Sequence, residues 1–270
     1  MAGRSRWLRV AVQDRLGPDM CGRYVNLTDF VFRSIYGFDR VVPLPPLERP
    51  KPDSAVSPLG AALAARRCWF RAKKPLFNIA PKSFAPIVRF SSTGEIEQVF
   101  ARWGLVPASF PTLEHANRFN MTNARAETVR ESNAFKHAYR SRRCLLPSNG
   151  FYEWRRFDDG KKWPYLIGLD DLEPLAYAGI WECWEREDKV LESFSILTTT
   201  PNKLMVRIHD RMPVILAQTD WQTWLDPQAS LPTLEGLLVP YPARGMEAFL
   251  VSPKVGSVKA SGPELLEPLR

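Results

Sequence analysis

The sequence has few cysteines and histidines. Its 270 residues include four cysteines, at positions 21, 68, 144 and 183, and no two of them are spaced as Cys-x-x-Cys. So few cysteines exclude a disulfide framework in a chain of this length and favour a reducing compartment. The three histidines, at positions 115, 137 and 209, are distant in sequence from one another and from the cysteines. We therefore expect no structural zinc, no other metal and no cofactor.

Long apolar runs are also missing. No run of about 18 apolar residues occurs, so no membrane-spanning helix is expected. The first twenty residues lack the apolar segment of a secretory signal, and their arginines are mixed with Asp14 and Asp19, which disfavours an organellar presequence. We interpret residues 1–19 as an extension, either a gene-start error or a disordered segment. The expected location is the cytoplasm, or the nucleus in a eukaryotic host.

The charge balance is basic. Lys and Arg together number 37 against 29 for Asp and Glu, a formal net charge of +8 and a sequence pI near 9.5. Such a balance favours polyanionic partners, because binding a phosphate backbone releases its counterions. The excess is spread along the chain rather than gathered in a tail, so an ordinary basic protein without such a partner stays an alternative.

Short runs of alternating apolar residues dominate the sequence after a Pro-rich stretch at 41–58, which we interpret as an exposed insertion. Alternation predicts strands over 86–90, 97–103, 143–147, 165–169, 176–182, 193–199 and 214–216. Helices are expected over 27–36, 128–138, 202–206 and 219–225. Residues 20–270 contain no internal repeat, which is consistent with one domain. The fold class is therefore α+β, a single domain on a mostly antiparallel sheet with flanking helices.

The most informative chemistry lies at Met20-Cys21-Gly22. A methionine before a small residue is where an initiator methionine is removed, and its removal would leave Cys21 as the first residue. The α-amine would then titrate near pH 8, so part of it is neutral at physiological pH and able to attack an aldehyde. Amine and thiol together can close a thiazolidine ring, which an internal cysteine cannot do. The alternative is a buried, inert cysteine.

Six motifs in the same order resemble those of the SRAP family, whose members process abasic sites in DNA. They are Met20–Tyr24 (MCGRY), Phe77–Pro81 (FNIAP), Trp103–Pro107 (WGLVP), Asn123–Thr128 (NARAET), Pro147–Trp154 (PSNGFYEW) and Ile208–Pro213 (IHDRMP). Any one of them alone would be weak evidence. The resemblance covers Met20 to the C-terminus. It implies a barrel-like sheet, and a thiazolidine crosslink to single-stranded DNA that shields the lesion.

The resemblance also implies catalytic roles for four residues: Cys21, Asn123, Glu153 and His209. Cys21 is the nucleophile. Apolar neighbours raise the pKa of a carboxyl group, which suits Glu153 to proton transfer during imine formation. The imidazole of His209 can protonate the ring oxygen of the sugar, and the amide of Asn123 can hold the sugar in register. The alternatives are a solvated strand glutamate, a structural histidine and a helix-capping asparagine.

Five further residues are expected to contact DNA. By resemblance, Arg125 and Arg211 contact phosphates, for which a planar guanidinium is well suited. Arg23 assists them, and Asn78 belongs to the second motif. Family members carry a tryptophan shortly after the WG motif, where this chain has Ala-Ser-Phe, so stacking on a base would fall to Phe110.

Three classes of function remain open at the sequence level. The leading one is a monomeric protein that crosslinks to abasic single-stranded DNA, with associated peptidase self-processing and lyase activities. The second is a cysteine peptidase that uses Cys21, His209 and Asn123. The third is a non-covalent reader of modified DNA, which would tolerate Cys21→Ala.

Overall fold

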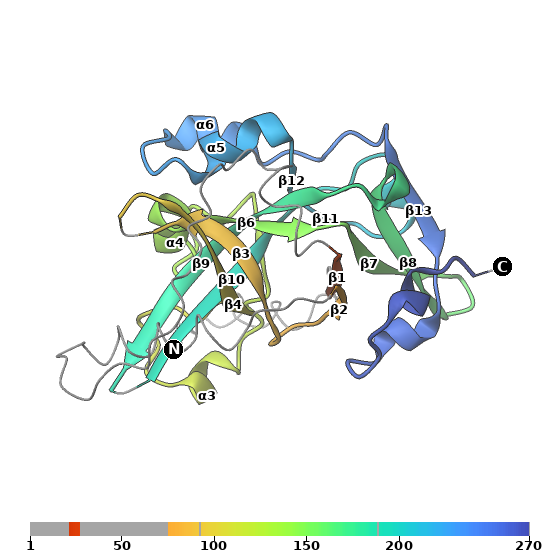
Figure 1. The fold of residues 1–270 in the computed structure, drawn as a ribbon, viewed down its shortest axis with the longest axis horizontal. Helices are drawn as coiled ribbons and strands as arrows, with labels where there is room; N and C mark the ends of the chain where they lie inside the picture. Colours follow the sequence, from red (N-terminus) through yellow and green to blue (C-terminus); the bar gives the residue numbers. More distant parts are fainter. Residues whose placement is uncertain (1–21, 28–74, 92, 188, 270) are drawn as a thin grey trace, which may run out of the picture.

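The computed structural model describes residues 22–27, 75–91, 93–187 and 189–269 (Figure 1). Four sequence-based predictions fall outside these residues: the extension at 1–19, the nucleophile Cys21, the Pro-rich insertion at 41–58, and the helix at 27–36 beyond Leu27.

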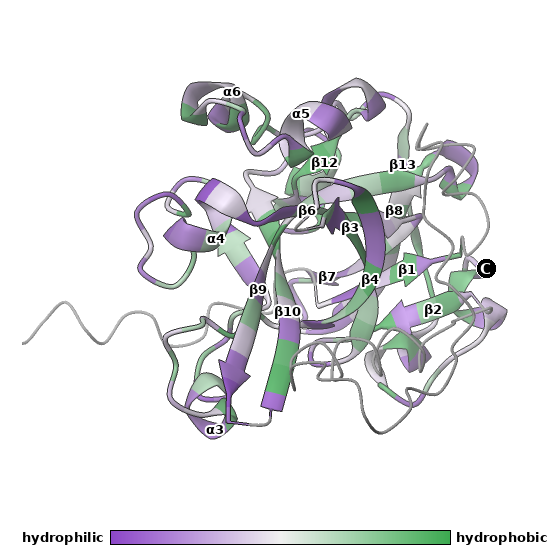
Figure 2. Cartoon of the chain, turned by 60° about the vertical axis from the view of Figure 1, so that its left-hand side comes forward, coloured by the Kyte–Doolittle hydropathy of each residue, from purple (hydrophilic) through white to green (hydrophobic). Residues whose placement is uncertain are grey.

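The larger of two sheets closes into a barrel. Its strand order is β11 (Met212–Pro213), β10 (Lys189–Thr199), β4 (Ile96–Trp103), β3 (Phe84–Phe90), β6 (Arg143–Ser148), β9 (Leu175–Arg186) and β12 (Ile215–Leu216). Because β10 also pairs with β9, the path from β10 through β4, β3, β6 and β9 returns to its start. The tips of β9 and β10 beside α3 (Leu113–Ala116) are hydrophilic (Figure 2), where Arg186 lies opposite Lys189.

The smaller sheet has the order β13 (Met246–Leu250), β8 (Lys162–Leu169), β7 (Gly150–Arg156), β1 (Arg23–Asn26) and β2 (Leu76–Ile79). All its pairings are antiparallel. In the larger sheet, β10 runs parallel to β4 and to β5 (Asn123–Arg125). The α+β class and the mostly antiparallel, barrel-like sheet are thus confirmed.

The helices are short and lie outside the sheets (Figure 1). Besides α3, the α-helices of the described residues are α4 (Lys136–Ser141), α5 (Trp221–Leu225) and α6 (Leu231–Gly236). The 3-10 turns are η1 (Asp170–Leu172), η2 (Met205–Arg207), η3 (Gln218–Asp220), η4 (Pro253–Gly256) and η5 (Pro263–Leu266). None of the helices in the described part of the chain has the length and apolar content needed to span a membrane.

Two of the predicted helices are wrong. Most of 128–138 is a succession of turns, and the helix α4 begins only at Lys136. Between Thr128 and Phe135 only Val129 is buried, so this segment lacks the apolar stripe that stabilises a helix against a core. At 202–206 the Asn202 side chain accepts hydrogen bonds from the backbone amides of Leu204 and Met205, and the chain forms only the 3-10 turn η2.

The three largest of four apolar clusters hold the sheets together. One fills the barrel with Ile87, Trp103, Tyr177 and Phe194, and one packs under α4 and α5. Packing requires a glycine at position 179, because a Cβ there would overlap the Leu146 side chain. The third cluster lies under the C-terminal turns.

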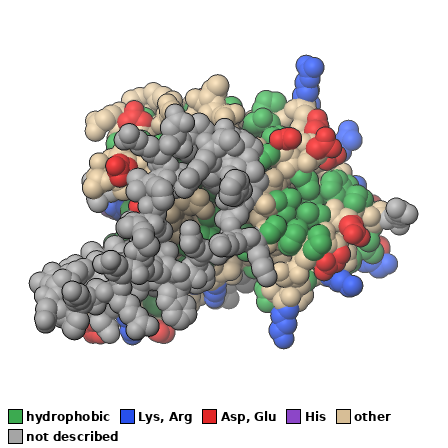
Figure 3. Space-filling model, viewed as in Figure 1, with side chains coloured by type: hydrophobic (Ala, Val, Ile, Leu, Met, Phe, Trp, Pro, Cys, Tyr) green, Lys and Arg blue, Asp and Glu red, His purple; other side chains and the backbone are tan. Residues whose placement is uncertain are grey.

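On the half of the molecule that carries β8 and β13, apolar side chains also group on the surface, with charged residues around them (Figure 3).

Candidate active site

Glu153 lies in the middle of β7 and its side chain is fully buried. Strand alternation turns it to the same face of the sheet as Phe151, which belongs to the barrel core. It is therefore not a solvated strand glutamate. Its carboxylate oxygen Oε1 is 3.6 Å from Nε2 of His209. The structure thus brings together two residues that are well separated in the sequence.

His209 follows η2 in a tight turn, in which its amide donates to the carbonyl of Met205. The backbone amide of Arg211 donates to its Nδ1 over 3.1 Å. Because Nδ1 is an acceptor, the neutral ring carries its proton on Nε2, the atom that faces Glu153. The exposed carboxylate of Asp210 is 2.9 Å from Nδ1 and would accept a proton from the cationic ring. Both charge states of the imidazole therefore have partners.

Burial lowers the pKa of His209 below its ordinary value of 6.5. The positive charges of Lys162 and Arg211 also lower this pKa, and the carboxylate of Asp210 opposes them. His209 is therefore neutral at pH 7, and its cation, once formed, is a stronger acid than free imidazolium. That property suits a group that must deliver a proton to a weakly basic oxygen.

The same lowered pKa gives a stability prediction. Since the unfolded chain binds this proton at a higher pH than the folded chain, the free energy of unfolding decreases as the pH falls below about 6.5 and levels off below the folded pKa. We expect His209→Gln to remove this contribution. The measurement is the difference in unfolding free energy between wild type and variant across pH 4 to 8, by urea titration. A difference that does not depend on pH would contradict the assignment.

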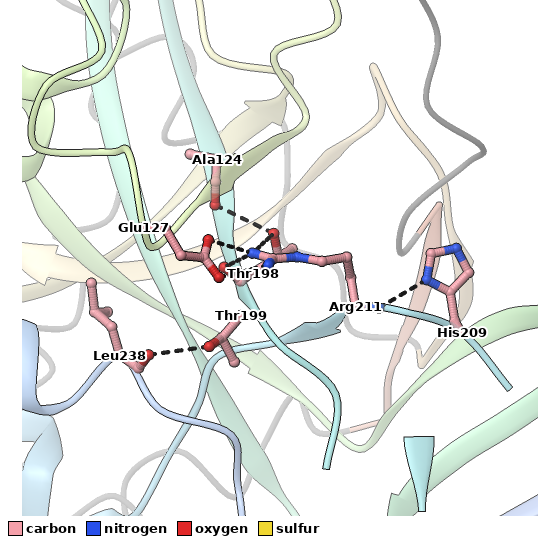
Figure 4. A network of polar contacts seen from close by, with 7 residues as sticks. All are labelled: Ala124, Glu127, Thr198, Thr199, His209, Arg211 and Leu238. Atoms are coloured by element: carbon pink, nitrogen blue, oxygen red, sulfur yellow. Dashed lines mark hydrogen bonds and ion pairs between the residues drawn. The ribbon is translucent and has the colours of Figure 1, made fainter. Parts of the chain in front are cut away.

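Arg211 faces away from solvent. Its guanidinium donates to both carboxylate oxygens of Glu127, over 2.6 and 2.8 Å, and to the carbonyl of Thr198 over 2.7 Å (Figure 4). Thr198 lies opposite Arg125 of β5 on one side and opposite Pro213 of β11 on the other. The C-terminal end of β10 therefore holds the Asn123–Thr128 motif and the Ile208–Pro213 motif together.

Asn123 and Arg125 sit on the short parallel strand β5. Asn123 is half-buried and pairs in register with Ile196, while Arg125 is exposed. Asn123 is thus part of a sheet and not the cap of a helix. The Arg125 guanidinium stands at the surface, next to the Glu127–Arg211 pair.

A cavity borders Gly22, the residue that follows Cys21. Its lining includes the cations Lys82, Arg102 and Arg118 and the aromatic ring of Phe119. Phe119 is 48% exposed, a large value for a phenylalanine. None of these residues was predicted from the sequence, although the cation and the aromatic ring of Arg118-Phe119-Asn120, just before the Asn123 motif, were a usable signal.

A second cavity includes His209 and is also basic. It is lined by Trp154, Arg155, Arg156, Lys162, Pro201, Val206, Arg207, Ile208, His209 and Asp210. The two cavities, one at His209 and one at Gly22, thus both carry several positive charges. Such surfaces suit the phosphates of a nucleic-acid strand.

Three of the residues expected to contact DNA have structural contacts. Asn78 donates to the carbonyls of Val255, Ser257 and Ala260. Arg23 donates to the side-chain oxygen of Asn78 over 3.1 Å and to the carbonyl of Gly256 over 2.7 Å. These two residues tie the C-terminal segment to β1 and β2.

Phe110 packs against His115 and Phe119, with ring centroids 4.9 and 5.5 Å apart, and so supports the exposed ring of Phe119.

Among the described residues, no group of three or more His, Cys, Asp or Glu side chains is arranged to hold a metal ion. The acid–base pair of Glu153 and His209 is the chemically distinctive arrangement of this region.

Comparison with known proteins assigns a family. Residues 20–258 match the profile of the SOS response associated peptidase (SRAP) family. The abasic site processing protein YoqW of Bacillus subtilis is 40% identical over 196 residues, which cover 72% of this chain and 86% of that protein. The abasic site processing protein HMCES of Mus musculus is 30% identical over 230 residues, covering 72% and 65%. A crystal structure of a Bacteroides thetaiotaomicron protein superimposes with a TM-score of 0.66 at 30% identity, covering 72% and 86%. The chain therefore belongs to the SRAP family.

Proposed function

We propose that this protein recognises abasic sites in single-stranded DNA and bonds covalently to the damaged sugar through Cys21, once the residues up to Met20 are absent. The observation that carries the proposal is the buried Glu153 carboxylate 3.6 Å from His209, on the strand that pairs with β1 directly after Cys21. The names of the relatives, abasic site processing proteins, support the substrate class.

Chain connectivity limits how far Cys21 can lie from Glu153 and His209. Arg23 lies opposite Tyr152, the neighbour of Glu153 on β7. Cys21 precedes Arg23 by two residues, so the distance between their Cα atoms is at most about 7 Å. This bound supports the assignment of the Cys21 amine to the site that contains Glu153 and His209.

The proposed chemistry has three steps. As His209 gives a proton to the ring oxygen of the closed sugar, the bond between C1 and that oxygen breaks and the C1 hydroxyl loses its proton to water, which leaves the open-chain aldehyde. The neutral α-amine of Cys21 adds to the aldehyde carbon, and the resulting carbinolamine loses one water to form an imine. Glu153 takes the proton of the ammonium before attack and returns it to the departing hydroxyl. The thiol then adds across the imine, with its proton passing to the nitrogen, and closes the thiazolidine without loss of any further atom.

Binding of the strand is assigned to polar and aromatic groups around this pair. Arg125 offers its guanidinium to a phosphate, and Arg211 adds positive charge nearby while its donors face Glu127 and Thr198. Phe119 provides a face for base stacking, worth about 1 to 3 kcal/mol per base. Asn123 holds the sugar hydroxyls.

The test uses the form that starts at Cys21 and three single-stranded oligonucleotides of the same sequence. One carries an abasic site, one carries that site reduced by borohydride, and one is intact. We expect a product that survives denaturing electrophoresis only with the first, because only it has an aldehyde. Equal, reversible binding to all three without such a product would replace the proposal with a non-covalent reader of DNA.

Self-processing peptidase activity is the second candidate, and the description of the family as a peptidase favours it. In this function the Cys21 thiol would attack the Met20 carbonyl, the Cys21 nitrogen would leave with a proton carried by His209, and water would then hydrolyse the Met20 thioester. Its check is the intact mass of protein expressed from Met20 in cells that lack methionine aminopeptidase activity. Retention of Met20 under those conditions would exclude self-processing.

A further inference from the structure

Glu127 has no part in the chemistry proposed above, yet it makes the closest contact with the 209–211 turn. Its side chain is 46% exposed and that of Arg211 is 13% exposed, and the two form a bidentate ion pair with N–O distances of 2.6 and 2.8 Å. The arginine holds the pKa of the Glu127 carboxyl below its ordinary range, mainly by these hydrogen bonds, so the carboxylate persists at acidic pH.

A continuous set of contacts runs from Glu127 to Glu153. The Glu127 carboxylate binds one edge of the Arg211 guanidinium, and the carbonyl of Thr198 on β10 accepts from the same group (Figure 4). The main-chain amide of Arg211 in turn donates to Nδ1 of His209. The opposite ring nitrogen, Nε2, is 3.6 Å from Glu153. Each contact fixes the next group in one orientation.

We propose that Glu127 is a positioning residue for His209. By holding the Arg211 side chain against β10, it fixes the conformation of the 209–211 turn. In that conformation Nδ1 of His209 accepts the hydrogen bond of the Arg211 amide, and the proton on Nε2 points to Glu153. The inference rests on the proposed function for the role of His209. It concerns orientation and not contact with DNA.

The geometry distinguishes this role from that of an ordinary surface pair. An ion pair between exposed side chains is worth about 0 to 1 kcal/mol and is screened by salt. Here the arginine is largely buried, both of its terminal nitrogens are engaged, and its own backbone carries the contact to the imidazole. The exposed pair Arg130–Glu235 has a single contact of 2.7 Å between side chains that are 50% and 42% exposed. It is a matched control on the same molecule.

Four charged groups act on His209, and all must be considered when its titration is followed. Glu153 faces Nε2, Asp210 lies beside Nδ1, and the cations Lys162 and Arg211 are within electrostatic range. Removing Glu127 leaves the Arg211 charge uncompensated, so a change in the titration of His209 alone would not separate orientation from charge. The tautomer of the neutral ring does separate them.

The experiment compares wild type with Glu127→Ala, Glu127→Gln, Arg211→Lys and the control Glu235→Ala. In DNA-free protein, nitrogen NMR of the imidazole reports which ring nitrogen is protonated. We expect wild type and Glu235→Ala to show one tautomer with the proton on Nε2. Glu127→Ala and Arg211→Lys are expected to show an average of both tautomers, and Glu127→Gln, which retains one acceptor oxygen, an intermediate pattern.

Crosslinking kinetics provide the second readout. We expect Glu127→Ala to lower the rate constant at saturating abasic DNA by about tenfold or more, since misplacement of a catalytic group by roughly 1 Å can cost on the order of 100-fold. Binding of intact DNA should not be weakened, because the uncompensated charge of Arg211 favours phosphates. A single Nε2 tautomer retained in Glu127→Ala would overturn the inference, and so would a rate constant equal to that of Glu235→Ala. Because the NMR pattern needs no DNA, absence of crosslinking in every protein, with the tautomer change present, would reject the proposed function and leave the positioning role standing.

Discussion

Loss of the covalent product is the expected result when Cys21 is replaced by alanine or when residues 1–20 remain attached. Alanine has no thiol, so an imine can form but no thiazolidine can close and the adduct is hydrolysed. With residues 1–20 attached, the amine becomes an amide, which does not attack an aldehyde. We expect both forms to give no adduct that survives heating, against near-complete conversion by the form that begins at Cys21.

The measurement is a denaturing gel together with the intact mass of the protein–DNA product. Cys183→Ala is the control, because Cys183 is the more exposed of the two free cysteines among the described residues. Burial raises the pKa of the Cys183 thiol, and that of the fully buried Cys144 still more, so both are poor nucleophiles. A heat-stable adduct formed equally by the form that keeps residues 1–20 would reject the assigned nucleophile.

Glu153→Gln is expected to lower the rate constant of crosslinking by about 100-fold or more, since positioned acid–base groups contribute roughly 10² to 10⁴. Glutamine has the shape of glutamate and fills the same buried site, but it cannot carry a proton between the ammonium and the departing hydroxyl. The measurement is the single-turnover rate at saturating DNA, followed from pH 5 to 9.

Glu192→Gln is the matched control for this variant. Glu192 is also a buried carboxylate, paired with Arg89 over 2.6 Å inside the barrel and away from His209. Its replacement removes a negative charge that balances the buried positive charge of Arg89. We therefore expect a lower free energy of unfolding and an unchanged rate constant of crosslinking. The two variants should thus show opposite patterns. A rate constant for Glu153→Gln within a factor of three of wild type would remove Glu153 from the mechanism.

The strands were the part of the fold most accessible from sequence. Short runs of alternating apolar residues located β3, β4, β6, β8, β9 and β10 to within a few residues. The strand β7 was not predicted. Its sequence, GFYEWRR, places Phe151 beside Tyr152 and ends in two arginines, so apolar and polar residues do not alternate along it. The turns at 128–135 were mistaken for a helix, because local helix propensity does not show whether a segment has an apolar core to pack against.

The candidate site was predictable in its residue types but not in its contacts. Family motifs named Glu153 and His209, and the fold places them together. The partnership of Arg211 with Glu127 could not be predicted, because it joins residues 84 positions apart through the end of β10. Asn78 was expected to contact DNA because it belongs to a family motif. Its side-chain amide instead donates to three carbonyls of the C-terminal segment, and the position of that segment beside β2 could not be predicted from the sequence.

The pairing of β1 with β2 has a consequence for loop-closure entropy. The two strands are neighbours in the smaller sheet, and Asn26 lies opposite Leu76. The chain between them therefore starts and ends at almost the same place. The entropy lost on closing such a loop grows only with the logarithm of its length, by about 0.6 kcal/mol for each doubling. The length of this connection is thus a weak determinant of stability, and a compact domain inserted between Leu27 and Pro75 should leave the barrel and the Glu153–His209 pair intact.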